Sequence, residues 1–492
     1  MSASGNQQLR KTAKHSAIYA VGTVFRRVSG LVMLPIYTRY LTPADYGVVE
    51  LLTLSINILG ILVGLRLGQA LFRYYLLAES EDRKHLVVST VQLTVLATSG
   101  VGTLLLWLVA DPLSRFLFGS DAYVYEFNLF VLTLATNAVA AIGMSYLRAR
   151  QMPVVFVSVG AAVLLFEIVL NLYFVVLLQL HVTGVVYSTV ISGIVLAGSL
   201  SVYVFAKVGV HFSRRLAAEL LGFVAPLILA GFGATYVAFA DRYFLRVFGG
   251  LHDVGLYALA ARLGSVLGTA FEAFNSSWVA DRFEIVKQDN AREVYGQFFR
   301  FLGAILLLAG AGLAIFAGDF FHIITDPEFY PAAGVVQILV AGIIIRMFVM
   351  FCNFGAVYTG RTRIIAESSW ARAVVATVGF LLLIPPLGVY GAALALLVAN
   401  AVEFAWLYRK STALYDMELE WRPVLLMAAA ATAATMVTQP LPAGRADFLA
   451  VRVIVYALLV VGVARLPFWR PDERALIREA LLSAVRRRRA GR

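Results

Sequence analysis

Along almost the whole chain, apolar stretches of roughly 20 residues are separated by short polar segments. A helix needs about 20 apolar residues to cross the hydrocarbon core of a bilayer, whereas the strands of a membrane barrel would alternate over about 10. The pattern therefore predicts an all-α polytopic membrane protein with about fourteen transmembrane helices. The expected spans cover residues 15–38, 45–66, 86–110, 124–147, 153–178, 183–206, 217–240, 254–278, 297–317, 331–357, 364–386, 388–408, 423–438 and 448–466.

Composition supports this class. The 492 residues are 60% hydrophobic and 14% charged, and the mean hydropathy is +0.81. A soluble domain would need about 25% charged residues to cover its surface. The single cysteine, Cys352, cannot form an intramolecular disulfide, and the six histidines show no ligand spacing, so we expect no metal and no cofactor.

The distribution of basic residues predicts the orientation. Of the 41 lysines and arginines, five lie in the odd-numbered loops, seven lie within spans, and the remaining 29 lie in the termini, in the even-numbered loops or at their borders. Because basic residues accumulate on the cytoplasmic side, both termini are expected in the cytoplasm and the chain in the cytoplasmic membrane.

The start, MSASGNQQLRKTAKHS, has no cleavable apolar region, so the first span is expected to be retained. This bias and anionic lipids explain the net charge of +12 better than nucleic acid does.

A repeat indicates two related halves. The DYG of Asp45–Gly47 recurs as the DVG of Asp253–Gly255, 208 residues later, and Gly268 matches Gly60 at the same offset. Six spans separate the matching elements, so the halves share one orientation and are related by an axis along the membrane normal. The expected domains are a six-span N-lobe over 1–208, a six-span C-lobe over 209–412, two appended spans over 413–468, and a basic tail over 469–492.

Polar residues inside the spans follow helical spacing, which places them on single faces. The stripes are Glu50, Thr53, Asn57, Gly60 and Gly64 in the second span, and Arg262, Ser265, Thr269, Glu272 and Ser276 in the eighth. A central arginine costs about 2.5–3.5 kcal/mol on an insertion scale, so such residues usually face a bundle interior or a water-filled cavity. The candidate substrate-binding residues are therefore Arg26, Arg27, Asn57, Arg66, Arg262 and Arg346, and the candidate coupling-ion sites are Glu272 and Glu50.

Some arginines lie near span ends, where long side chains can reach the membrane interface. Arg66 and Arg73 in or just after the second span can act as such anchors rather than as ligands. Arg300 and Arg452 are expected to act as anchors for the same reason.

The arginines deeper in the spans also have alternative roles to ligand binding. Arg26 and Arg27 lie about 100° apart on a helix, so we expect only one of them to face a given ligand. Arg262 can instead form an internal ion pair with Glu272 or with a neighbouring span, which would be structural.

The C-terminal stretch PDERALIREALLSAVRRRRAGR predicts a short amphipathic helix ending in four arginines. It is expected to lie on the cytoplasmic leaflet, held by anionic lipids. Contact with a partner protein, such as a component of glycan assembly, is the alternative.

The first hairpin, residues 18–75, contains the turn TRYLTPADYG and ends in LGQALFRYY. It resembles the opening of the Wzx-type polysaccharide-biosynthesis flippases of the multidrug/oligosaccharidyl-lipid/polysaccharide (MOP) exporter superfamily. The resemblance implies a V-shaped pair of six-helix lobes that translocates a polyprenyl-diphosphate-linked oligosaccharide. In the related lipid II flippases, arginines of spans 1, 2 and 8 line the cavity, and the matching positions are Arg26 or Arg27, Arg66 and Arg262. The appended spans form a groove for the lipid tail in those relatives.

The expected activity is therefore that of a flippase working by alternating access. Arginine suits a diphosphate because its fork donates paired hydrogen bonds and its charge is permanent. Two alternatives remain open at this stage. One is export of organic cations, as in multidrug antiporters of the superfamily, and the other is a membrane-embedded glycan polymerase or ligase. The latter commonly has a long outside loop, whereas the longest outside loops expected here, near 241–253 and 318–330, have about a dozen residues.

Overall fold

The computed structural model describes residues 33–63, 67–465 and 469, and the regular elements in this part are helical. Within these residues, nine helical segments are long and apolar enough to cross a membrane. The predicted all-α polytopic membrane fold is therefore confirmed. The exact number of fourteen spans is not confirmed. Most of the first span lies outside the described residues, two long helices each cover two predicted spans, and the predicted spans 45–66 and 423–438 are not among the nine segments.

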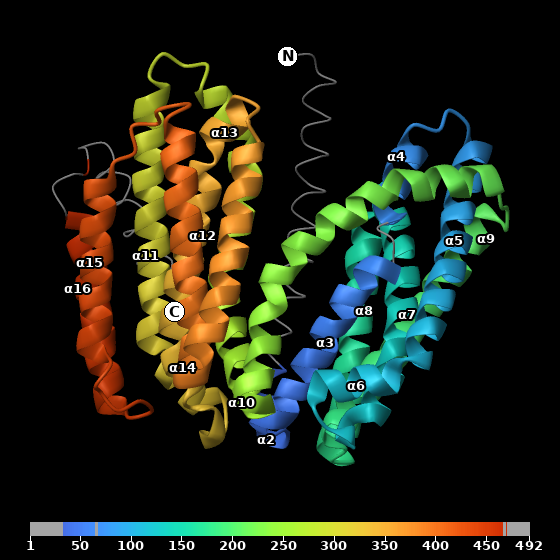
Figure 1. Cartoon of the computed structure of the whole chain (residues 1–492), viewed down its shortest axis with the longest axis horizontal. Helices are drawn as coiled ribbons and strands as arrows, with labels where there is room; N and C mark the ends of the chain where they lie inside the picture. Colours follow the sequence, from blue (N-terminus) through green and yellow to red (C-terminus); the bar gives the residue numbers. More distant parts are fainter. Residues whose placement is uncertain (1–32, 64–66, 466–468, 470–492) are drawn as a thin grey trace, which may run out of the picture. The chain divides into compact units, whose positions relative to one another are not determined.

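The chain divides into two compact units, Met1–Gly255 and Leu256–Arg492 (Figure 1). The first unit contains α2 (Leu34–Tyr40), α3 (Pro43–Val63), α4 (Leu67–Leu76), α5 (Glu81–Leu108), α6 (Ala110–Phe118), η1 (Asp121–Tyr123), α7 (Val124–Ala149), α8 (Pro153–Asn171), η2 (Leu172–Leu177), α9 (His181–Val208) and most of α10 (Arg214–Ile285). The second unit contains the rest of α10, α11 (Ala291–Ile324), η3 (Pro327–Phe329), α12 (Ala332–Cys352), α13 (Phe354–Tyr358), α14 (Arg363–Thr412), α15 (Trp421–Thr438) and α16 (Ala446–Arg465).

Two glycines interrupt the longest helices. Gly250 in α10 has a φ of 84° and Gly388 in α14 has a φ of 53°, a left-handed conformation that glycine adopts without steric cost. These breaks separate the predicted spans 7 and 8, and 11 and 12. The loop predicted over 241–253 is wrong in its first part, because α10 stays helical up to Gly250. Similarly, α11 extends to Ile324, into the loop predicted over 318–330.

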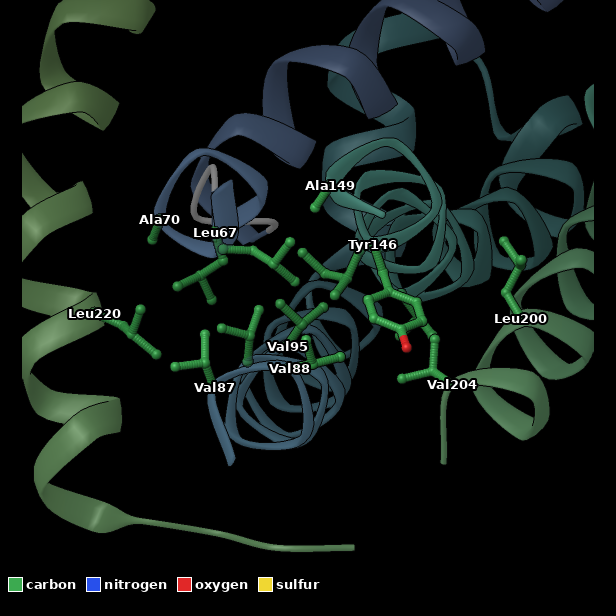
Figure 2. Close-up of a cluster of buried hydrophobic side chains, with 14 of the residues drawn as sticks. Leu67, Ala70, Val87, Val88, Val95, Tyr146, Ala149, Leu200, Val204 and Leu220 are labelled. Carbon is green, nitrogen blue, oxygen red and sulfur yellow. The ribbon is translucent and has the colours of Figure 1, made fainter. Parts of the chain in front are cut away.

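The core of the first unit joins α4, α5, α7, α9 and α10 (Figure 2). Its buried side chains include Leu67, Ala70, Val87, Val88, Val95, Tyr146, Ala149, Leu200, Val204 and Leu220. Small residues let helices approach closely in a membrane protein, and a Cβ added at Gly143 would lie 2.7 Å from the Cβ of Leu200. By contrast, Leu104 and Leu105 of α5 and Val169 of α8 are exposed, as suits a surface that contacts lipid tails.

The start of α3 is fixed by its sequence. Pro43 follows Thr42 in a position where its missing N–H costs nothing. The N–H of Asp45 donates to the Thr42 hydroxyl at 3.2 Å, and the N–H of Thr42 donates to the Asp45 carboxylate at 3.1 Å. This reciprocal pair is a capping box, which satisfies free N–H groups at the helix N-terminus.

The two copies of the repeat pack against each other inside the first unit. A Cβ on Gly47 would overlap the carbonyl oxygen of Leu251, and a Cβ on Gly255 would overlap the carbonyl oxygen of Pro43. The pairs Pro43/Leu251 and Gly47/Gly255 are both separated by 208 residues. The contact is therefore reciprocal, as expected for elements related by a two-fold axis.

Buried ion pairs attach the two C-terminal spans to α11. Arg452 of α16 donates to both oxygens of Asp319 at 2.8 and 2.9 Å, and Arg300 of α11 pairs with Glu420 beside the start of α15. Arg300 and Arg452 are 2% and 4% exposed. The expectation that these two arginines anchor at the membrane interface is thus wrong, because carboxylates from neighbouring segments hold them inside the bundle.

We expect Gly47→Ala or Gly255→Ala to destabilise the protein by about 1–3 kcal/mol, because the added methyl group meets backbone atoms that cannot rotate away. The measurement is thermal unfolding of the purified protein in detergent. Gly100→Ala and Gly198→Ala are matched controls, since a Cβ at either position has no atom within 4 Å. Equal melting temperatures for all four variants would contradict the close contact.

Candidate functional site

The structure tests the position of only some predicted site residues. Arg26, Arg27 and Arg66 lie outside the described residues. The other five are described and fall in both units: Asn57 and Glu50 in α3, Arg262 and Glu272 in α10, and Arg346 in α12.

The polar stripe of α3 lies on the accessible face of this helix. Thr53 and Asn57 are exposed, whereas Leu54 and Ile56 are each 4% exposed and pack into the first unit. The polar stripe predicted from helical spacing therefore coincides with the exposed face of α3, and the apolar residues coincide with its buried face.

Asn57 borders a polar pocket of about 530 Å³ within the first unit. Three helices, α3, α4 and α7, form its wall. Its polar side chains are Asn57, Gln69, Asn137, Ser145 and Arg148. Because amides are expensive to place against hydrocarbon, this pocket is better suited to water or a polar ligand than to lipid tails.

Arg148, at the C-terminal end of α7, is the cationic member of the pocket. Its guanidinium carbon lies 5.4 Å from the ring centre of Phe72 and 5.6 Å from that of Phe156, and it donates to the Ser145 hydroxyl at 3.2 Å. Sequence reasoning missed this residue because it resembles any arginine at a span end. The spacing of Asn137, Ser145 and Arg148 on one helical face was the available signal.

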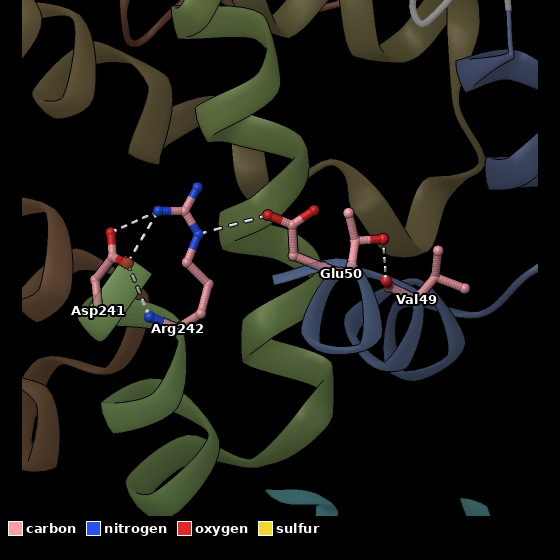
Figure 3. A network of polar contacts seen from close by, with 5 residues as sticks. Val49, Glu50, Asp241 and Arg242 are labelled. Carbon is pink, nitrogen blue, oxygen red and sulfur yellow. Dashed lines mark hydrogen bonds and ion pairs between the residues drawn. The ribbon is translucent and has the colours of Figure 1, made fainter. Parts of the chain in front are cut away.

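Glu50 belongs to a charged cluster between α3 and α10 in the first unit (Figure 3). Arg242 donates to both oxygens of the fully buried Asp241 at 2.9 and 2.8 Å, and its Nε lies 3.6 Å from the Glu50 carboxylate. Nearby, the hydroxyls of Ser55 and Tyr243 lie 3.0 Å apart. Arg242 is thus a partner of two carboxylates inside a helical bundle, although the sequence placed it in an outside loop.

In the second unit, two arginines share one carboxylate. Arg346 of α12 and Arg372 of α14 lie 3.3 and 3.5 Å from Glu403, which also accepts a hydrogen bond from Ser369 at 3.3 Å. The side chain of Glu403 is 6% exposed and that of Arg346 is 46% exposed. The group carries one net positive charge, and Arg346 is its accessible member.

The polar stripe of the eighth predicted span also lies on an accessible face of α10. Ser265 and Glu272 are exposed and Arg262 is partly exposed, whereas Leu263 and Leu267 are buried. The Ser265 hydroxyl donates to the carbonyl oxygen of Arg262 at 2.7 Å, as polar side chains in apolar helices commonly do.

The second unit also contains an apolar groove of about 680 Å³. Side chains of α11, α12, α14 and α15 line it, among them Leu307, Ile338, Ile344, Phe404, Trp421 and Leu425. Its lining is largely aliphatic and aromatic, which suits an apolar chain.

Helical bundles with polar and cationic side chains on accessible faces of otherwise apolar spans are typical of multi-pass membrane transporters. The sequence model of a family described as "Polysaccharide biosynthesis protein" matches residues 36–331, more than half of the chain. The chain therefore belongs to this family of polysaccharide biosynthesis proteins. A search of curated proteins gave no match.

Solved structures share its fold. The lipid II flippase MurJ in an inward closed conformation has a TM-score of 0.70 at 12% identity, over 91% of this chain and 98% of that chain. An inward-facing multidrug resistance MATE transporter of the MOP superfamily has a TM-score of 0.60 at 17% identity, over 79% and 95%. A point mutant of the Vibrio cholerae MATE transporter VcmN has a TM-score of 0.56 at 16% identity, over 85% and 100%. The chain therefore shares the fold of these three proteins.

The shared carboxylate of the second unit predicts an asymmetric response to mutation. Glu403→Gln should destabilise by about 3–5 kcal/mol, because two partly buried guanidinium groups lose their shared counter-charge. Arg346→Gln should cost no more than about 1 kcal/mol, because Arg372 still pairs with Glu403 and Arg346 is half exposed. Thermal unfolding in detergent measures both. A larger loss for Arg346→Gln than for Glu403→Gln would contradict the assignment of Arg346 as the accessible member.

Proposed function

We propose that the chain is a flippase that moves a polyprenyl-diphosphate-linked oligosaccharide from the inner to the outer leaflet of the cytoplasmic membrane. The match to the polysaccharide biosynthesis family is the observation that carries this proposal. The structural similarity to a protein described as a lipid II flippase supports a lipid-linked substrate. In this proposal both termini lie in the cytoplasm, the basic tail contacts anionic lipids, and proteins of glycan assembly supply the substrate.

Such a substrate has three parts with different chemical needs. Its diphosphate requires cations, for which we propose Arg26, Arg27, Arg66, Arg262 and Arg346. Its sugar hydroxyls require hydrogen-bonding groups such as the Asn57 amide. The accessible polar stripes of α3 and α10 support this division, because they offer these groups along spans that are otherwise apolar.

The lipid tail requires an apolar surface. We propose that the groove lined by α11, α12, α14 and α15 takes part of the tail, while the rest stays in the bilayer. This assigns a role to α15, one of the two appended spans. The headgroup can then cross by alternating access of the two units without entering hydrocarbon.

Energy for transport requires a coupling site, for which Glu272 is the first candidate and Glu50 the second. Glu272 lies on the same stripe of α10 as Arg262 and is exposed in its unit. Protonation of Glu272 would favour binding of the diphosphate by Arg262, and loss of the proton would favour release. Glu50 is the weaker candidate because its carboxylate lies beside Arg242.

A second candidate function is export of organic cations. One observation favours it: among the described residues, the partly buried Glu167 contacts no basic side chain, and its carboxylate instead accepts a hydrogen bond from Thr189 at 3.4 Å. A carboxylate in this setting could attract a cation. The arginine-bearing stripes and the polysaccharide family favour the anionic, sugar-bearing substrate over this one.

Arg262→Ala or Arg26→Ala should abolish surface polysaccharide at unchanged protein level, because the diphosphate loses its charge-assisted hydrogen bonds. The measurement is surface polysaccharide in a strain that depends on this chain, with the protein quantified by immunoblot. Arg215→Ala is the control, since its side chain is 92% exposed and lies outside the polar stripes. Normal polysaccharide in both test variants, or a drug-resistance phenotype without any effect on glycan, would overturn the proposal.

Glu272→Gln should remove the response of transport to an imposed pH or sodium gradient. The reason is that the amide can neither bind a proton nor attract a cation at neutral pH. The measurement is flipping of a lipid-linked oligosaccharide in proteoliposomes with and without the gradient. A gradient response equal to that of the wild type would show that Glu272 is not the coupling site.

A further inference from the structure

The charge of Arg148 has no carboxylate partner among the described residues. Arg148 is exposed, in the last turn of α7. Five other arginines do have such a partner: Arg242, Arg300, Arg346, Arg372 and Arg452 all contact a carboxylate. Arg148 instead contacts two aromatic rings and one hydroxyl. Its positive charge is therefore available to an anion that enters the pocket.

The contacts of Arg148 hold its guanidinium without consuming its hydrogen-bonding capacity. Phe72 and Phe156 contribute ring contacts at 5.4 and 5.6 Å, and the hydrogen bond to Ser145 occupies one N–H. A guanidinium has five N–H donors, and paired donors match the oxygens of a phosphate. Restricting the side chain before a ligand arrives lowers the entropy cost of binding.

The rest of the pocket offers unpaired amides. Asn57, Gln69 and Asn137 are exposed, and none makes a side-chain hydrogen bond to a described residue. Amides both donate and accept, so they suit phosphate oxygens and sugar hydroxyls alike. At about 530 Å³ the pocket lies within the usual size range of small-molecule sites.

We propose that this pocket is a binding site for a phosphoryl anion, with Arg148 as its cation and Asn57, Gln69 and Asn137 as its hydrogen-bonding wall. The proposal rests on the proposed function in one respect, because the diphosphate of a lipid-linked sugar is the expected source of the anion. The headgroup of an anionic membrane lipid carries the same chemistry and is the other source.

Three other arginines show what distinguishes Arg148. Arg282 is 5% exposed, bonded to Asn353 at 2.9 Å and packed against Phe283 and Phe354, and burial lowers the pKa of its guanidinium below the usual value. This environment suits a structural cation. Arg73 lies 4.7 Å from the ring centre of Phe223, and Arg150 lies 5.8 Å from that of Tyr146. Neither forms an ion pair with a described carboxylate, although Arg150 lies within electrostatic range of Glu81, and neither lines the pocket.

These neighbours supply matched controls. Full-length protein is placed in phosphatidylcholine nanodiscs and titrated with geranylgeranyl diphosphate, with geranylgeraniol, and separately with phosphatidylglycerol, while affinity is followed by microscale thermophoresis. The test variants are Arg148→Gln and Asn137→Asp. The second variant keeps the packing around Arg148 and adds a negative charge to the pocket wall, so it remains informative if Arg148→Gln folds poorly.

Both test variants should bind geranylgeranyl diphosphate about tenfold more weakly than the wild type, as expected for the loss of one charge-assisted contact. Arg73→Gln and Arg150→Gln should bind it within about twofold of the wild type, and geranylgeraniol should bind equally to all variants. If only phosphatidylglycerol binding depends on Arg148 and Asn137, the phosphoryl site stands and its ligand is a membrane lipid. The site is refuted if the wild type binds neither phosphate-bearing probe or if the test variants bind both as the wild type does.

The proposed function is judged separately by the surface polysaccharide of the Arg262→Ala and Arg26→Ala strains. If both strains make normal polysaccharide while phosphoryl binding still depends on Arg148, the transport proposal fails and the site survives. If these strains lack surface polysaccharide while phosphoryl binding does not depend on Arg148, the phosphoryl site is refuted and the transport proposal stands.

Discussion

A charge inside an apolar helical bundle must be compensated, because removing an ion from water costs several kcal/mol even after relaxation. Both units obey this constraint through ion pairs, some between neighbouring residues of one helix and some between different helices. In the first, Arg242 meets Asp241 and Glu50, and in the second, Arg452 meets Asp319. Most of the arginines inside the bundles therefore serve packing, and an arginine in a span is a poor indicator of a binding site until its counter-charge is known.

The sequence repeat is explained by its place in the first unit. Gly47 and Gly255 occupy the same position in the two copies, and each leaves room for the backbone of the other copy. No other residue permits this approach, because every other side chain begins with a Cβ that would overlap a carbonyl oxygen. The glycine of the repeated Asp-x-Gly sequence is thus explained by a contact between the two copies rather than by a ligand site.

Hydropathy was sufficient to predict an all-helical fold. A backbone surrounded by lipid must satisfy its own hydrogen bonds, so an apolar segment of about 20 residues forms a helix. Hydropathy gave the wrong helix boundary where charged residues lie inside a helix. Asp241 and Arg242 suggested a loop, yet each is matched by a charge within hydrogen-bonding or ion-pair reach, so the helix continues. Asp241 is the neighbour of Arg242 in the chain, whereas Glu50 lies in another helix, and a single sequence does not show that Arg242 and Glu50 meet.

The candidate site was partly predictable for the same reason. Helical spacing placed Asn57 and Arg262 on polar stripes, which depend only on local geometry, and in the structure Asn57 is exposed and Arg262 partly exposed. It could not identify Arg148, whose significance comes from two aromatic rings, one of them in α4, and from the amides that share its pocket. It also could not distinguish Arg300 from an interfacial anchor, because its partner Glu420 lies 120 residues away.

The attachment of the last two spans has a consequence for how such chains can gain or lose helices. Arg300 and Asp319 lie on α11, in the six-helix part of the second unit, and their counter-charges, Glu420 and Arg452, lie beside α15 and in α16. A chain shortened before Glu420 would remove these two counter-charges from the guanidinium of Arg300 and the carboxylate of Asp319. Removal of the appended hairpin would therefore have to be accompanied by neutral side chains at both positions of α11 to avoid this cost.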